Sequence, residues 1–160
     1  NQELEDARGK AYQAFEEKRT EIDLKYATDR KKAKIVFKTD SLILKELGLK
    51  GAIPRTYVKW LEKINLFYNT LNTQTEILAK LATLQITAQS VSDQLTAIDD
   101  LENLRAAYIQ AKGNGQNATK TKNKAFKDLE KWMSTFYAVA RLALEGEPQL
   151  LESLGKFVKS

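Results

Sequence analysis

Two stretches of this chain share one residue pattern at a constant offset of 107 residues. Residues 33–48 read AKIVFKTDSLILKELG, and residues 140–155 read ARLALEGEPQLLESLG. Both end in Leu-x-x-Leu-Gly, with Gly48 closing the first stretch and Gly155 the second. Such a recurrence favours two related structural units. The alternative is that two amphipathic helices resemble each other only through their shared period.

The apolar residues near the start follow the spacing of one helix face. Six of them recur at sums of three and four positions, which predicts a helix over residues 5–38. They are Ala11, Phe15, Ile22, Tyr26, Ala33 and Phe37. Asp29 and Arg30 interrupt this face near its middle. Asp40 then suits the N-cap of a short helix over residues 41–47, which Gly48 ends.

The second copy repeats this ending with other residues. Glu147 stands where Asp40 stood, Pro148 takes the first helical position, and Gly155 closes the short helix. The long helix before it is expected over residues 118–144. Its expected buried residues are Leu129, Trp132, Met133, Phe136, Val139, Ala140 and Leu144.

Further helices are expected between the two copies, over residues 54–112. Pro54 opens the first of them, with Val58 among its expected buried residues. Residues 73–76 fit a capping box that restarts the helix, and Thr87 suits a later N-cap between the apolar residues Ile86 and Val91. Residues 113–117, Gly-Asn-Gly-Gln-Asn, predict a turn, because each glycine costs about 1 kcal/mol inside a helix. An uninterrupted helix is the alternative.

The composition agrees with a helical protein that has its own core. A chain of 160 residues buries roughly 70% of its unfolded surface. Two prolines and seven glycines leave few breaks, which favours long helices. We therefore predict an all-α fold, an antiparallel helical bundle of two pseudo-repeated units, about residues 5–50 and 113–158. Helices 54–112 join them within one domain, residues 1–160.

The absence of two residue types excludes several kinds of chemistry. The chain has no Cys, and so no disulfide, zinc-thiolate site or thiol nucleophile. It has no His, the commonest general base near neutral pH and the commonest transition-metal ligand. We find no catalytic or cofactor signature. We therefore expect a protein that is not an enzyme, with no catalytic residues, no cofactor and no metal.

Localisation is weakly constrained. No stretch approaches the ~20 apolar residues of a membrane span, and no charged-then-apolar leader stands at the start. The chain begins at Asn1 rather than Met, and the lack of Cys suits cytosol and periplasm equally. Localisation stays open, with the cytoplasm favoured.

Two clusters of basic residues are candidates for binding anions. The candidate residues are Arg30, Lys31, Lys32 and Lys34 in the first cluster and Lys120, Lys122, Lys124 and Lys127 in the second. If they shared one face, that face would attract nucleic acid or an anionic membrane surface. The alternative is a solvated helix face, which is more common at a net charge of only +5.

Aromatic residues offer a second candidate site. Tyr57, Trp60, Trp132, Tyr137 and Arg141 would line a pocket if the two units packed together. The alternative is that aromatic residues at helical spacing belong to the core. The same neighbourhood is where a third reading, an enzyme without His or Cys, would place its chemistry.

The C-terminal part also resembles a known family. A Trp-Met-x-x-Phe segment begins at Trp132, and a Pro-Gln-Leu-Leu-Glu-x-Leu-Gly end begins at Pro148. Over residues 33–160 the chain resembles a family of bacterial all-helical proteins whose activity is not assigned. The resemblance implies an all-helical domain in a bacterial cell, and carries over no activity and no site.

These observations together favour an interaction protein. We expect a helical interaction or scaffold protein that associates with itself or with a protein partner, because long amphipathic helices carry apolar residues near their ends. Leu49, Phe157 and Val158 are such residues. The alternative function is binding of nucleic acid or an anionic membrane surface through the two lysine-rich faces.

Overall fold

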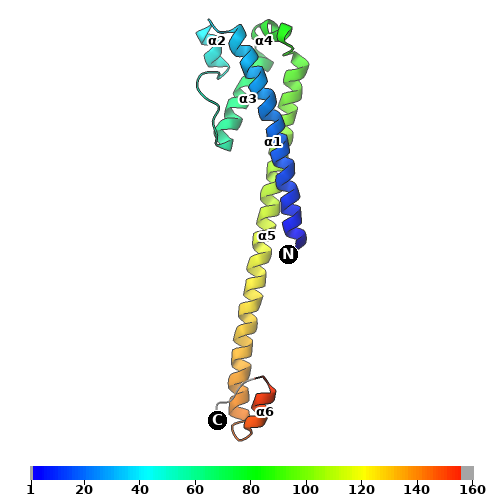
Figure 1. Ribbon diagram of the computed structural model, residues 1–160, viewed down its shortest axis with the longest axis vertical. Coiled ribbons are helices and arrows are strands. Elements are labelled where there is room, and N and C mark those ends of the chain that lie inside the picture. The colour runs from blue at the N-terminus through cyan, green and yellow to red at the C-terminus, as the bar shows by residue number, and fades with distance from the viewer. Residues whose placement is uncertain (1, 156–160) are drawn as a thin grey trace. The chain divides into compact units, whose positions relative to one another are not determined.

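The computed structural model describes residues 2–155, and within them every regular element is helical (Figure 1). The elements are α1 (Gln2–Val36), α2 (Ser41–Glu46), α3 (Tyr57–Thr73), α4 (Thr75–Leu81), the 3-10 helix η1 (Ala82–Leu84), α5 (Ala88–Ala143) and α6 (Pro148–Ser153). The predicted all-α class is confirmed. Phe157 and Val158, two of the residues expected to support association, lie outside the described part.

The chain divides into two compact units. The larger unit spans Gln2–Lys112, and the smaller unit begins at Gly113, where the second predicted repeat also begins. The boundary falls inside α5.

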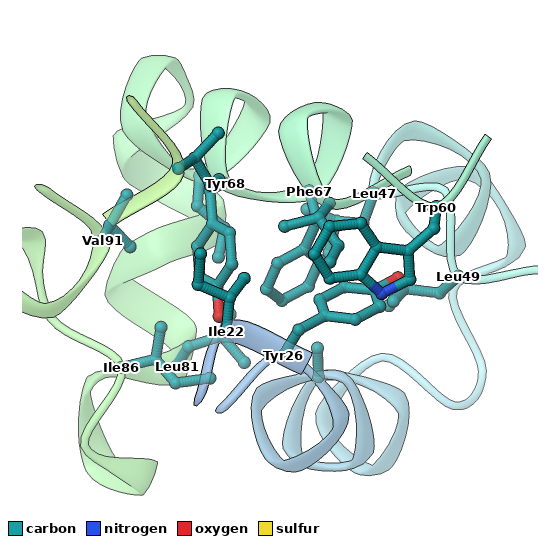
Figure 2. Close-up of a cluster of buried hydrophobic side chains, with 14 of the residues drawn as sticks. Ile22, Tyr26, Leu47, Leu49, Trp60, Phe67, Tyr68, Leu81, Ile86 and Val91 are labelled. Atoms are coloured by element: carbon teal, nitrogen blue, oxygen red, sulfur yellow. The ribbon is translucent and has the colours of Figure 1, made fainter. Parts of the chain in front are cut away.

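The core of the larger unit is built on the predicted face of α1. Phe15, Ile22, Tyr26 and Ala33 are all buried there, as the helical spacing predicts. Side chains from other elements complete this core. Figure 2 shows Trp60 and Phe67 from α3 and Val91 from α5 in the same cluster as Tyr26 and Ile22. Leu49, expected as an apolar residue available for association, is instead part of this core.

Two helices of this unit run in the same direction. The Trp60 indole Nε1 donates to Asp23, and the Tyr68 hydroxyl donates to Asp29, so both helices advance together from one contact to the next. The predicted antiparallel bundle therefore does not describe the pair α1 and α3, which run parallel (Figure 1). The connection over residues 47–56 is long enough for this, because ten extended residues reach about 33 Å.

Asp29, which interrupts the apolar face of α1, is a buried carboxylate with two polar partners. Asp29 is buried, accepts the Tyr68 hydroxyl at 3.0 Å, and lies 2.8 Å from the Lys25 Nζ. Burial raises the pKa of Tyr68 far above its usual range, and the Asp29 carboxylate adds to that rise. A carboxylate on an apolar face is tolerated here because both partners are supplied.

Caps explain where several helices begin. Asp40 accepts the Ile43 N–H at 3.1 Å, and Thr87 and Ser90 exchange backbone-to-side-chain hydrogen bonds at the start of α5. Both predicted N-caps are confirmed. The predicted capping box at Thr73 is wrong, because its hydroxyl donates backwards to the carbonyls of Asn69 and Thr70.

The predicted turn at residues 113–117 is also wrong. α5 runs through this stretch without a break, and neither Gly113 nor Gly115 has a positive φ. The Thr119 hydroxyl donates to the Gly115 carbonyl in the ordinary helical back-bonding pattern. Two glycines weaken a helix by about 1 kcal/mol each, yet the helical turns on both sides carry the helix through them.

The two related segments have the same local backbone. Residues 33–48 and 140–155 each form a helix end, a turn, a short helix and a glycine with positive φ. Four backbone hydrogen bonds recur at the offset of 107. They are Phe37 N to Ala33 O and Leu144 N to Ala140 O, Asp40 N to Phe37 O and Glu147 N to Leu144 O, Leu44 N to Asp40 O and Leu151 N to Glu147 O, and Gly48 N to Lys45 O and Gly155 N to Glu152 O.

Candidate interaction surfaces

The smaller unit exposes a dense group of apolar side chains. Of the large apolar residues that are exposed in the described chain, nine lie between residues 126 and 154. They are Phe126, Leu129, Trp132, Met133, Phe136, Val139, Leu142, Leu150 and Leu154. The larger unit, more than twice as long, exposes eight. Soluble monomers rarely show such a concentration, so this is the strongest candidate for a contact surface.

The exposed residues follow one side of α5. Leu129, Trp132, Phe136 and Val139 are spaced by three, four and three positions, with Phe126 and Met133 beside them. We call these six residues the apolar stripe. The sequence predicted the spacing correctly but placed five of these residues, all except Phe126, in a core. That placement is wrong for these five residues, because on this stretch only Ala140 is buried, with Tyr137 and Leu144 half-buried.

The short helix α6 packs on a neighbouring part of the same helix. Leu151 and Ala140 are buried, and the Tyr137 hydroxyl donates to the Leu154 carbonyl at 3.0 Å. Trp132 and Phe136 stack with ring centroids 5.4 Å apart. The packing of α6 against the end of α5 therefore holds that end in place and leaves the apolar stripe uncovered.

The second lysine cluster does not form one face. Lys120, Lys124 and Lys127 follow helical spacing, but Lys122 projects to the opposite side, in line with Leu129. Lys124 is also held in an ion pair with Asp128 at 2.7 Å. The arrangement resembles a solvated helix face with one lysine at the end of the apolar stripe.

Arg30 of the first basic cluster stabilises a loop. The Arg30 guanidinium donates to the carbonyls of Leu49 and Gly51, so it holds the loop after α2. Lys63, which the sequence analysis missed, donates to the carbonyls of Lys50 and Ala52 at 2.8 and 3.2 Å. Four successive carbonyls are thus bound by two cations.

The surroundings of these cations are already positive. Burial lowers the pKa of Lys63, and the nearby charges of Arg30 and Lys34 lower it further. Lys31 is exposed, whereas Lys32 and Lys34 are half-buried. No local sequence pattern marked Lys63, because its partners lie more than ten residues away. The first cluster belongs to the larger unit and the second to the smaller one, so the shared positive face stays a prediction.

The candidate aromatic pocket is divided between the units. Tyr57 and Trp60 lie in the larger unit, and Trp132, Tyr137 and Arg141 lie in the smaller one. The pocket that would combine all five therefore stays a prediction.

In the larger unit, cations cover the rings. Arg105 lies 4.5 Å from the centre of the Tyr57 ring, and Arg19 lies 5.4 Å from that of Trp60. An open hollow of about 460 Å³ borders Tyr57 and Arg105, and one of about 450 Å³ borders Arg19 and Trp60. Trp60 is buried, whereas Val58, which the sequence predicted to be buried, is exposed.

The described residues show neither a cluster of metal ligands nor a membrane-spanning helix. Within residues 2–155, no three acidic side chains gather closely enough to hold a metal ion. Among the described helices, none combines the length and apolar sequence needed to cross a membrane.

Comparison with models of protein families, with curated proteins and with solved structures gave no match. The resemblance to a bacterial helical family therefore rests on the Trp-Met-x-x-Phe and Pro-Gln-Leu-Leu-Glu-x-Leu-Gly segments alone.

Proposed function

We propose that this chain is a non-enzymatic helical interaction protein that associates with itself through the apolar stripe. The observation that carries the proposal is the exposure of six large apolar side chains along one side of α5. Half-exposed side chains of this size leave roughly 100 Å² each, or roughly 600 Å² in total. The largest apolar patch on a typical monomer is about 300–600 Å², and patches of that size are often functional.

We also propose that the two related segments are copies of one helical unit. The recurring backbone hydrogen bonds support this, and so does the burial of Ala33 and Ala140 in both copies. The copies differ on their outer side. Leu47 is 0% exposed and its counterpart Leu154 is 38% exposed.

The difference has a local cause. In the first copy α3 covers the hairpin, and a Cβ on Gly48 would lie 2.9 Å from the Leu66 Cδ2. A Cβ on Gly155 would meet nothing within 4 Å. The second copy therefore exposes the face around Leu154 and Gly155, whereas the first copy buries the equivalent face around Leu47 and Gly48. This difference supports an interaction role for the exposed face.

Sedimentation velocity tests self-association. We expect the intact chain to sediment as a dimer at about 100 µM and to dissociate on dilution, because the patch is at the small end of stable interfaces. Leu129→Glu with Val139→Glu should give a monomer, since each charge removes an apolar contact and adds a desolvation cost. Ile35→Glu is the control, because Ile35 is also an exposed aliphatic residue, at 70% against 50% for Leu129 and 60% for Val139, but lies on α1. A monomer at all concentrations would remove the proposal.

The alternative function, binding of nucleic acid or an anionic membrane surface, stays a prediction. Arg30 is engaged by loop carbonyls and Lys124 by Asp128, so neither is fully available to a phosphate. Binding to generic DNA or acidic vesicles that falls steeply with salt, and that requires Lys31 and Lys127, would favour it over self-association.

A further inference from the structure

The part of α5 at the boundary between the two units contains a chemically reactive pair of residues. Asn114 is followed by Gly115, and no other asparagine in the sequence precedes a glycine. We infer that Asn114 is a site of spontaneous deamidation, that local opening of α5 sets its rate, and that the isoaspartyl product ends the helix there. This inference goes beyond the proposed self-association and does not depend on it.

The reaction joins the backbone of Gly115 to the side chain of Asn114. The Gly115 nitrogen attacks the Asn114 Cγ, the side-chain amide takes up the proton and leaves as ammonia, and a cyclic imide forms. Water then opens the imide at either carbonyl, which gives aspartate or isoaspartate. Glycine permits this attack because it has no Cβ to crowd its nitrogen and because its backbone is little restricted.

The closed helix suppresses this reaction. Residues 113–117 lie inside α5, where the Gly115 N–H donates to the carbonyl one helical turn earlier. That hydrogen bond occupies the attacking nitrogen, and the imide requires a ψ at Asn114 outside the helical range. Deamidation therefore proceeds from the opened stretch, and its rate follows the fraction of molecules in which α5 is open there.

Three observations favour opening at this place. Gly113 and Gly115 each make the open state about five-fold more populated than alanine would. A Cβ at either glycine would meet nothing within 4 Å, so no neighbouring side chain packs on the helix at these positions. Along α5, no side chain between Leu101 and Ala140 is buried. Because helices depend mainly on packing for their stability, this stretch opens more readily than the parts of α5 that contribute to a core.

The isoaspartyl product changes the backbone itself. Isoaspartate continues the chain through its former side chain, so it adds one carbon to the backbone and leaves a carboxylate beside it. The added carbon shifts the following N–H and carbonyl groups out of the helical hydrogen-bond register. The product therefore ends α5 beside Gly113, where the smaller unit begins. The helix after residue 114 then loses its continuation from the larger unit.

Mass spectrometry of the intact chain after incubation at mildly alkaline pH tests the site. Trypsin cuts after Lys112 and Lys120, so one peptide contains both Asn114 and Asn117. Asn117 is the internal control, because it is exposed on the same helix but precedes Ala118. We expect Asn114 to be converted and Asn117 to stay unchanged. Equal conversion of the two asparagines, or none at Asn114, overturns the inference.

The same measurement in concentrated urea tests whether α5 controls the rate. The native rate should lie below the rate in urea by about the protection factor of the Gly115 N–H in hydrogen exchange, because both reactions need the open stretch. Gly113→Ala keeps the reactive pair and has room for its Cβ. It should leave the rate in urea unchanged and slow the native rate about five-fold. Equal rates in the native chain and in urea, or a native rate that Gly113→Ala does not change, overturn the control by α5.

Asn114→Asp tests the effect of the product on the helix. This variant has the new charge but an ordinary backbone, so it should stay helical through residue 114. The isoaspartyl chain, separated by chromatography, should show a weaker helical signal in circular dichroism. Under native conditions trypsin should cut it after Lys112 or Lys120 several-fold faster than it cuts Asn114→Asp, because cleavage needs an open helix. Equal cleavage of the two chains would show that α5 accommodates isoaspartate and would overturn the inferred helix end.

Discussion

Tyr68 and Asp29 form a buried polar pair whose contribution depends on pH. Burial and the adjacent carboxylate raise the pKa of Tyr68 above the ordinary 10.0, and burial also raises that of Tyr26. The folded state therefore keeps these protons at a pH at which the unfolded chain has lost them. A raised folded pKa contributes stability that is present below the unfolded pKa and is lost as pH rises above it.

We expect the free energy of unfolding to fall as the pH passes about 10, by up to about 1.4 kcal/mol per pH unit for each buried tyrosine. Urea unfolding at several alkaline pH values measures this. Tyr68→Phe should reduce the slope but also destabilise the protein at neutral pH, because Asp29 loses a donor. Tyr12→Phe, at an exposed position, should change neither. An unchanged slope in Tyr68→Phe would contradict the buried pair.

Gly48 shows how one residue ends an element. Its φ of +63° is costly for a residue with a Cβ, and the added carbon would also press on the flexible end of Leu66. Gly48→Ala should therefore lower the free energy of unfolding by about 1 kcal/mol. Gly9→Ala is the matched contrast, because Gly9 lies inside α1 in open space and Ala favours a helix by about 1 kcal/mol. Thermal unfolding should shift in opposite directions for the two variants.

Among the elements, those with strong local signals were predictable. The face of α1, the Asp40 and Thr87 caps and the glycine ends follow from spacing and steric rules that involve only near neighbours. The parallel packing of α3 was not, because it depends on contacts such as Tyr68 with Asp29 across 39 residues. Nor could spacing tell whether the apolar stripe is covered, since a core face and an interaction face have the same period.

The glycines in α5 show a conflict between local preference and helix continuity. Residues 113–117 favour a turn by composition, yet they are helical. Gly113→Ala with Gly115→Ala should then increase helical stability by about 1–2 kcal/mol and slow amide exchange around these positions. If the stretch were a turn that needs glycine, the same variant would lose stability and helical signal. Circular dichroism during thermal unfolding, together with hydrogen exchange, separates the two outcomes.

At the scale of the whole molecule, burial is uneven. Every residue of the described core cluster lies between Phe15 and Leu101, within the larger unit. In the smaller unit only Ala140 and Leu151 are buried among the described residues. With so small a core, the part of α5 in this unit is stabilised by its continuation from the larger unit and by whatever covers its apolar side.

This division predicts the behaviour of a chain that ends after Lys112. It keeps the entire described core cluster, so it should fold, with near-native Tyr and Trp spectra for the larger unit and one cooperative urea transition. It lacks the apolar stripe, so it should be monomeric and its melting temperature should not depend on concentration. The intact chain should melt at a higher temperature as its concentration rises, because self-association stabilises the folded state by mass action. An unfolded truncated chain would show that the larger unit needs residues beyond Lys112. A truncated chain that still dimerises would move the contact out of the smaller unit.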